Sequence, residues 1–175
     1  MPRLDPAECR RRLAAARHAY LATASGDGRP HVVPVTFAVV GREGTAGADG
    51  GWDVVSAVDH KPKAGGDARR LRRLRNLADN PRAAVLADAY DDDWDRLWWV
   101  RADGSATVED VVAPSGADGE GGAAATRAAL EALADRYPQY RERPPAGPVV
   151  RVRVARWTGW EAAATGAAGA TPAAR

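Results

Sequence analysis

The chain has 175 residues, of which 45% are hydrophobic, 25 are basic and 23 are acidic. This length and composition are typical of a single globular domain and exclude a chain that is disordered throughout. The net charge of +2 gives no reason to expect general nucleic-acid binding. No stretch approaches the roughly 18–20 apolar residues of a membrane span. The N-terminus lacks the apolar core of a signal peptide, so we expect a cytoplasmic protein.

The first third of the chain predicts one helix followed by strands. Asp5 is a suitable helix N-cap, and Pro6 suits the first helical position. The apolar runs on either side of the turn at residues 25–30 predict a hairpin. Pro34 lies in its second strand, and because proline has no N–H for a ladder hydrogen bond it belongs at a bulge or a sheet edge. The expected elements are a helix over residues 5–17 and strands over residues 19–24, 31–40 and 52–58.

The rest of the chain predicts further helices and strands. Leucines at positions 71, 74 and 77 form a helical stripe with arginines on the other faces. Two strand-like runs, residues 97–101 and 105–112, flank Ala102-Asp103-Gly104 and predict a second hairpin. The other expected elements are helices over residues 67–79 and 123–137, strands over residues 82–88 and 149–155, and a disordered Ala/Gly-rich tail over residues 162–175.

Short, hairpin-like connections between most strands favour a mainly β, α+β fold. We expect an antiparallel β-barrel with peripheral helices, formed by residues 1–161. The chain has neither a GxGxxG motif after a strand nor a P-loop lysine, so dinucleotide-binding and P-loop folds have little support. His18, His31 and His60 lie far apart and Cys9 is the single cysteine, so we expect no metal site and no internal disulfide.

Positive charge concentrates between residues 61 and 82, where eight basic side chains stand against two acidic ones, a net of +6. Only two of the 25 basic residues are lysines, and both, Lys61 and Lys63, lie in this segment. Such cations can converge on one phosphate or carboxylate group, and among the arginines we favour Arg73 for this role. The alternative is a solvated basic face. A nucleic-acid site is disfavoured because no aromatic residue is interleaved with the cations.

Three of the six tryptophans lie between residues 94 and 99, beside a run of aspartates. Trp98 and Trp99 face opposite sides of a strand, so one can be core and the other a contact for a ligand or a second subunit. The aspartates lack the spacing and the glycine of a calcium loop and predict a solvated turn. No Ser-His-Asp or Cys-His arrangement is visible, so in an enzyme we expect a cofactor to supply the difficult chemistry.

Several short motifs, in their order and spacing, resemble the pyridoxamine 5′-phosphate oxidase-like superfamily of flavin-binding split β-barrels. The motifs are Ala19-Tyr20-Leu21-Ala22-Thr23, Asp27-Gly28-Arg29-Pro30-His31-Val32-Val33-Pro34-Val35, Arg75-Asn76-Leu77, Asn80-Pro81-Arg82 and Leu97-Trp98-Trp99-Val100-Arg101 with Gly104. Residues 59–63 and 92–101 look most like the branch that uses the deazaflavin coenzyme F-420. Residues 156–160 differ from the Arg-Leu-His-type substrate motif of true pyridoxamine phosphate oxidases, so vitamin B6 oxidation is not expected.

The resemblance implies a homodimeric split barrel with two cofactor sites at the subunit interface. It implies an F-420-dependent oxidoreductase that transfers a hydride to a small unsaturated acceptor, such as an enone, a quinone or a tetrapyrrole, with His31, Tyr90 or water as the proton source. The expected cofactor-binding residues are Pro34, Val35, Thr36, Val55 and Ser56 along the ring, Lys61, Lys63, Arg73 and Asn76 near the phosphate, and Trp98 as an aromatic contact. The alternatives are an FMN oxidase or reductase of the same fold, and a non-enzymatic protein that binds F-420 or another anion. Neither nucleic acid nor membrane is expected as a partner.

Overall fold

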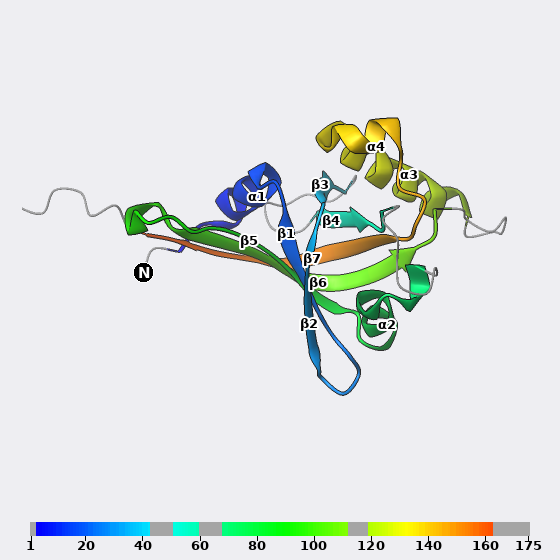
Figure 1. The fold of residues 1–175 in the computed structure, drawn as a ribbon, viewed down its shortest axis with the longest axis horizontal. Helices are drawn as coiled ribbons and strands as arrows, with labels where there is room; N and C mark the ends of the chain where they lie inside the picture. The colour runs from blue at the N-terminus through cyan, green and yellow to red at the C-terminus, as the bar shows by residue number, and fades with distance from the viewer. Residues whose placement is uncertain (1–2, 43–50, 60–67, 112–118, 163–175) are drawn as a thin grey trace, which may run out of the picture.

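The structure is a computed structural model, and it describes residues 3–42, 51–59, 68–111 and 119–162. These residues form a seven-stranded antiparallel sheet with helices packed around it, an α+β fold (Figure 1). The strands are β1 (Ala19–Ala24), β2 (Pro30–Val35), β3 (Ala38–Gly41), β4 (Trp52–Ala57), β5 (Arg82–Ala89), β6 (Trp98–Glu109) and β7 (Val149–Glu161). The helices are α1 (Pro6–Ala15), α2 (Arg72–Asp79), α3 (Gly119–Arg136) and α4 (Pro138–Glu142), with short 3-10 helices at Ala68–Arg70 and Trp94–Arg96.

The sheet curls because its two edge strands are consecutive in the chain. The strand order is β2-β1-β5-β6-β7-β4-β3, and each adjacent pair is antiparallel. Only Thr36 and Phe37, which we call the strap, separate β2 from β3. The two edges must therefore approach each other at the strap, and the architecture is consistent with the expected barrel.

The prediction of a single strand over residues 31–40 is wrong. The chain pairs with β1 up to Val35 and with β4 from Ala38 onward. The apolar pattern is continuous across this change of partner, because Phe37 in the strap is itself fully buried in the core. The apolar sequence pattern therefore predicts correctly that these residues are buried, but it does not indicate which strand they pair with.

Pro34 lies on a sheet edge, as the sequence predicted. It stands opposite Tyr20 in β2, which pairs with β1 and ends the strand order on that side. The missing N–H of proline therefore removes no hydrogen bond from a central ladder.

The predicted second hairpin is wrong, because β6 is one long strand between β5 and β7. Its register with β7 shifts between Asp103 and Gly104. A Cβ atom at Gly104 would lie 2.0 Å from the carbonyl oxygen of Arg153. The glycine that suggested a turn instead permits close backbone approach at an irregularity inside the strand.

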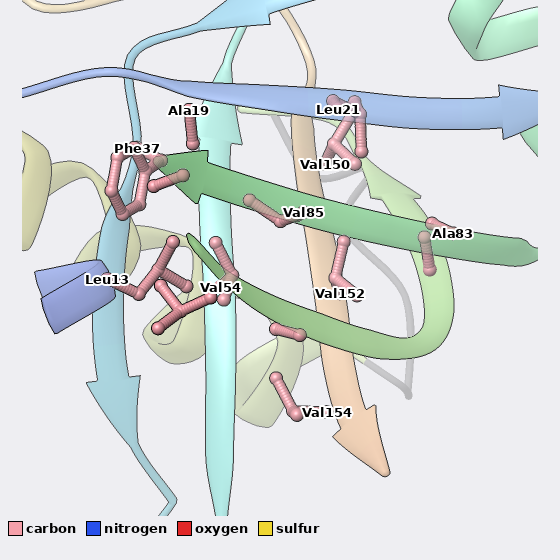
Figure 2. Close-up of a cluster of buried hydrophobic side chains, with 14 of the residues drawn as sticks. Leu13, Ala19, Leu21, Phe37, Val54, Ala83, Val85, Val150, Val152 and Val154 are labelled. Atoms are coloured by element: carbon pink, nitrogen blue, oxygen red, sulfur yellow. The ribbon is translucent and has the colours of Figure 1, made fainter. Parts of the chain in front are cut away.

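A hydrophobic core fills the inside of the curled sheet and is covered by α1. Figure 2 shows side chains from β1, β4, β5 and β7 together with Leu13 of α1 and Phe37 of the strap, both of which are fully buried. A second, smaller cluster lies under α3, where Leu133 packs with Val55 and Val149. Removing this apolar surface from water is the main force that holds the sheet curled.

The helix at the start of the chain has the predicted cap. The backbone N–H of Glu8 donates to Asp5 Oδ1 at 2.8 Å. The Glu8 carboxylate pairs with Arg11 and Arg12, both at 2.6 Å. These contacts lower the pKa of Glu8 to about 2, with the hydrogen bond from Arg11 as the largest cause.

The later helices follow the prediction in place and differ in their bounds. α2 ends at Asp79, as predicted, but begins at Arg72 rather than at residue 67, and α3 begins at Gly119 rather than at residue 123. The short helix α4 was not predicted, because Pro138 looked like a stop signal and instead occupies a first helical position. None of the helices in the described ranges is both long and apolar enough for a membrane span. The predicted tail lies outside the described residues except for Ala162.

Candidate functional site

An open cavity of about 360 Å³ lies where β2, the end of β4 and α2 meet. Its lining residues are His18, Pro34, Val35, Thr36, Ser56, Ala57, Asp59 and Arg73. Five of the ten predicted cofactor-binding residues come together here, namely Pro34, Val35, Thr36, Ser56 and Arg73. They come from three segments that the sheet order and the strap bring to one place.

The cavity combines an apolar wall with a few polar groups. Pro34, Val35 and Ala57 provide the apolar surface, and Thr36 and Ser56 add hydroxyl groups. Sites for small molecules commonly have this composition, in which apolar contacts hold a flat ligand and a few polar groups orient it.

Arg73 gives the cavity its positive charge. Its side chain is half-buried on α2, and no hydrogen bond or ion pair joins it to another residue that the structure describes. Burial lowers the pKa of Arg73, and the negative charge of Asp59 opposes that shift. A guanidinium held partly out of water without an ion-pair partner is suited to an incoming phosphate or carboxylate.

Among the residues that line the cavity, His18 carries an imidazole and Asp59 carries a carboxylate. The His18 ring stands edge-on to the Tyr20 ring, with centroids 5.5 Å apart and an interplanar angle of 84°. Sequence reasoning missed His18, since a lone histidine before a strand carries no pattern. It noted Asp59 only as part of the basic segment that follows.

The strap is held against the cavity by two tyrosines at the junction of α3 and α4. Thr36 Oγ1 and the Tyr140 hydroxyl lie 2.7 Å apart, and the backbone N–H of Phe37 donates to the Tyr137 hydroxyl at 3.1 Å. The Tyr137 hydroxyl in turn donates to the carbonyl of Arg17 at 3.1 Å. Neither tyrosine was predicted, because about 100 residues separate each of them from its partner in the strap.

A second basic cavity, of about 410 Å³, lies on another side of α2. It is lined by Ser25, Arg29, Arg72, Arg75, Asn76 and Asp79. The Asn76 amide is buried and donates to Thr23 Oγ1 at 3.1 Å, which fixes α2 to β1. Asn76, predicted near the cofactor phosphate, thus lies with this second cavity and not with the first.

The two predicted proton donors lie outside the first cavity. His31 is on β2 beside α2, where burial, followed by the charges of Arg72 and Arg73, lowers its pKa. Because His31 lies near two arginines and resists protonation, it is better suited to accepting a hydrogen bond or contacting an anion than to supplying protons. Tyr90 is 87% exposed just after β5.

The remaining predicted residues are dispersed or lie outside the described ranges. Val55 is fully buried in the cluster under α3. Trp98 begins β6, opposite Glu161 of β7, and the Arg12 guanidinium lies 5.6 Å from its ring centroid. Glu109, at the other end of β6, pairs with Val149 of β7, which in turn pairs with Ala57 at the end of β4 that lines the cavity. Trp98 lies eleven residues from Glu109 along β6 and is therefore far from the cavity. Lys61 and Lys63 lie outside the described residues.

No group of three or more potential metal-binding side chains occurs in the described part of the chain. The acidic segment before β6 hydrogen-bonds to itself: Asp91 and Asp93 each accept from the backbone N–H two residues later, at 3.0 and 3.1 Å. These bonds define a turn of the kind that the sequence predicted.

Solved structures of other proteins share this class of fold, a curled antiparallel sheet with peripheral helices. A conserved hypothetical protein of Mycobacterium tuberculosis is 18% identical with a TM-score of 0.63, over 98% of this chain and 93% of that chain. A FAD-binding protein of Mesorhizobium loti is 20% identical with a TM-score of 0.57, over 90% and 95%. The FAD binding protein of Mycobacterium smegmatis is 18% identical with a TM-score of 0.52, over 91% and 95%. A search of curated protein sequences finds no significant match.

The sequence itself identifies the family. Residues 5–161 match the family model described as pyridoxamine 5′-phosphate oxidase. Because the match spans nearly the whole chain, the protein belongs to this family, as the motifs around β1, β2 and α2 predicted.

Proposed function

We propose that this protein is an F-420-dependent oxidoreductase that transfers a hydride from the reduced deazaflavin to a small unsaturated acceptor such as an enone, a quinone or a tetrapyrrole. The observation that carries the proposal is the cavity that combines an apolar wall, two hydroxyls and the half-buried Arg73. Membership of the pyridoxamine 5′-phosphate oxidase family supports a redox cofactor at this place.

The residues of the cavity fit such a cofactor. Pro34 and Val35 would pack on the flat ring, Thr36 and Ser56 would bond its polar rim, and Arg73 would pair with its phosphate. When bound, the deazaflavin supplies the hydride. The protein would hold ring and acceptor in near-attack geometry, with the His18 imidazole on the same cavity wall as a group that can pass a proton.

The second basic cavity favours F-420 over FMN. Arg72, which lines this cavity, and Arg73, which lines the first, are consecutive on α2. An F-420 molecule extends beyond its phosphate as an acidic tail, whereas FMN ends at its phosphate. Arg29 and Arg75 are placed to attract such a tail and have no ion-pair partner among the described residues. A flavin remains the second candidate, because two proteins of similar fold are described as FAD-binding.

A homodimer is part of this proposal. β2 ends the strand order, and Val32 on it is 58% exposed, a large apolar side chain on a sheet edge. Exposed edges of this kind are commonly covered in native assemblies. Light scattering on the purified protein should give a molecular mass twice the 18.5 kDa of one chain. A mass equal to that of one chain at micromolar concentration would contradict the dimer.

The test is a fluorescence titration of the purified protein with F-420, FMN and FAD. We expect F-420 to bind with micromolar or tighter affinity and FMN much more weakly. Replacing Arg29 and Arg75 together by glutamine should weaken F-420 binding about 5-fold to 30-fold at low salt, since exposed ion pairs contribute roughly 0.5–1 kcal/mol each, and should leave FMN binding unchanged. Arg143→Gln, an exposed charge outside both cavities, is the control. Tighter binding of FMN or FAD would contradict the deazaflavin assignment, and tight F-420 binding without turnover on any acceptor would indicate a storage or sensing protein.

A further inference from the structure

A hydrogen bond between the hydroxyls of Thr36 and Tyr140 links the cavity wall to the C-terminal helices. Thr36 lines the cavity, while Tyr140 on α4 lies behind it and is 8% exposed. Their oxygens are 2.7 Å apart, and either atom can be the donor. Which of them donates determines what Thr36 can offer a ligand.

The environment of Tyr140 favours one direction for this hydrogen bond. Burial raises the pKa of Tyr140, the hydrogen bond with Thr36 opposes this shift, and the nearby negative charge of Asp59 adds to it. The net pKa lies above its ordinary value, so the phenol keeps its proton throughout the physiological range. A buried hydroxyl whose proton has no acceptor lowers the stability of the protein by roughly 1–3 kcal/mol. Among the described residues, Thr36 Oγ1 is the one hydrogen-bond partner of the Tyr140 hydroxyl, whereas Thr36 also faces the cavity. The phenol therefore donates to Thr36, and the Thr36 oxygen acts as acceptor.

The Thr36 hydroxyl is then left with its own proton for the cavity. A hydroxyl has one proton and two lone pairs, and a hydroxyl that already accepts a bond donates more strongly. The strap cannot turn away, because the Phe37 N–H is held by Tyr137 and the Phe37 side chain is fully buried.

We propose that Tyr140 is a positioning residue that makes Thr36 a hydrogen-bond donor toward a carbonyl oxygen or ring nitrogen of the bound cofactor. This inference rests on the proposed function and deepens it. It predicts that the site selects ring systems with an acceptor at this position, and that a residue outside the cavity wall sets the selection.

A double-mutant cycle tests the relay with F-420 and FMN as probes. Thr36→Val removes the donor while keeping the shape, and should weaken the preferred cofactor about threefold to tenfold, the value of a single hydrogen bond. Tyr140→Phe should weaken it about twofold to fivefold, because Thr36 keeps its hydroxyl but loses its orientation and polarisation. Thr36→Ser should restore most of the affinity.

The decisive readout is coupling between the two sites. In the Thr36→Val background, Tyr140→Phe should have no further effect on affinity, whereas two independent structural effects would add. Additive losses, or wild-type affinity in Tyr140→Phe, would overturn the relay while leaving the proposed function intact. A wild-type protein that binds neither F-420 nor a flavin would overturn both. Arg143→Gln, an exposed residue outside both cavities, is the control, and thermal unfolding of each variant confirms that it is folded. Should Tyr140→Phe fail to fold, wild-type affinity in Thr36→Val would by itself refute the proposal and a loss rescued by Thr36→Ser would support it.

Discussion

Replacing Arg73 by glutamine should move cofactor affinity and protein stability in opposite directions. The side chain lies half-buried in the cavity without an ion-pair partner among the described residues. Burial lowers its pKa, and Asp59 compensates only in part. The free protein therefore bears a cost for holding this charge, and the benefit appears only when an anion binds.

The magnitudes follow from the two environments. A hydrogen bond to a charged group contributes about 1.5–3 kcal/mol, so Arg73→Gln should weaken binding of F-420 roughly 10-fold to 150-fold. In the free protein the neutral side chain removes the burial cost. The melting temperature should therefore stay constant or rise by about 2–4 °C, the shift expected for 1 kcal/mol in a chain of this size.

The assay is a fluorescence titration paired with thermal unfolding of the free protein. Arg73→Lys should recover part of the affinity, because it restores the charge without the planar fork, and Arg143→Gln should change neither quantity. If Arg73→Gln lowers the melting temperature by several degrees, the cation is a structural element and the reasoning fails. Unchanged affinity would show that the phosphate lies elsewhere.

Three further predictions concern the scaffold. Gly104→Ala should destabilise the protein by several kcal/mol, because the new Cβ would lie 2.0 Å from a carbonyl oxygen of β7. Gly122→Ala on α3, where a Cβ would meet no atom within 4 Å, should instead stabilise the protein by about 0.5–1 kcal/mol. Denaturant unfolding compares the two variants, and equal effects would contradict the close approach at Gly104. Asp53→Ala should cost about 1–3 kcal/mol in the same measurement, because Asp53 is 3% exposed and its loss removes the ion pairs with Arg151, at 3.3 Å, and Arg42, at 3.5 Å, while Glu109 continues to pair with Arg151 at 2.7 Å; a loss below about 0.5 kcal/mol would refute this. Glu8 has its pKa lowered to about 2, so its contribution is complete above about pH 4.5 and is lost as the pH falls toward 2; Glu8→Gln should flatten the fall in melting temperature over that range, and an unaltered profile would count against it.

Local chemistry made much of the fold predictable. The helix cap at Asp5, the edge position of Pro34 and the short strands each follow from a property of one or two residues. Pairing partners did not, because a residue's hydrophobicity reports that it is buried and not which strand covers it. For that reason residues 31–40 looked like one strand, and Gly104 looked like a turn although its role is close backbone approach within β6.

The candidate site was predictable in proportion to how local its residues are. Pro34 and Val35 lie in a family motif and Thr36 directly follows it, and Arg73 lies in a cluster of positive charge that is visible in the sequence alone. Tyr140 has neither signal, because its role depends on a helix that returns to the strap after a hundred residues of chain.

The two groups of residues have different tasks in the proposed function. The segments with family motifs, β1, β2 and α2, build a surface able to hold a ring and a phosphate, and such a surface alone does not distinguish a deazaflavin from a flavin. The features that can distinguish them lie at its margins. In the proposed site, Arg29 and Arg75 would extend the positive charge past the phosphate, and Tyr140 would determine the hydrogen that Thr36 presents to the ring. Cofactor choice in this fold can therefore change through residues at the margin of the ring site while the ring-binding strands stay the same, and variants at these margins should alter the ratio of F-420 to FMN affinity more than variants of Pro34 or Val35.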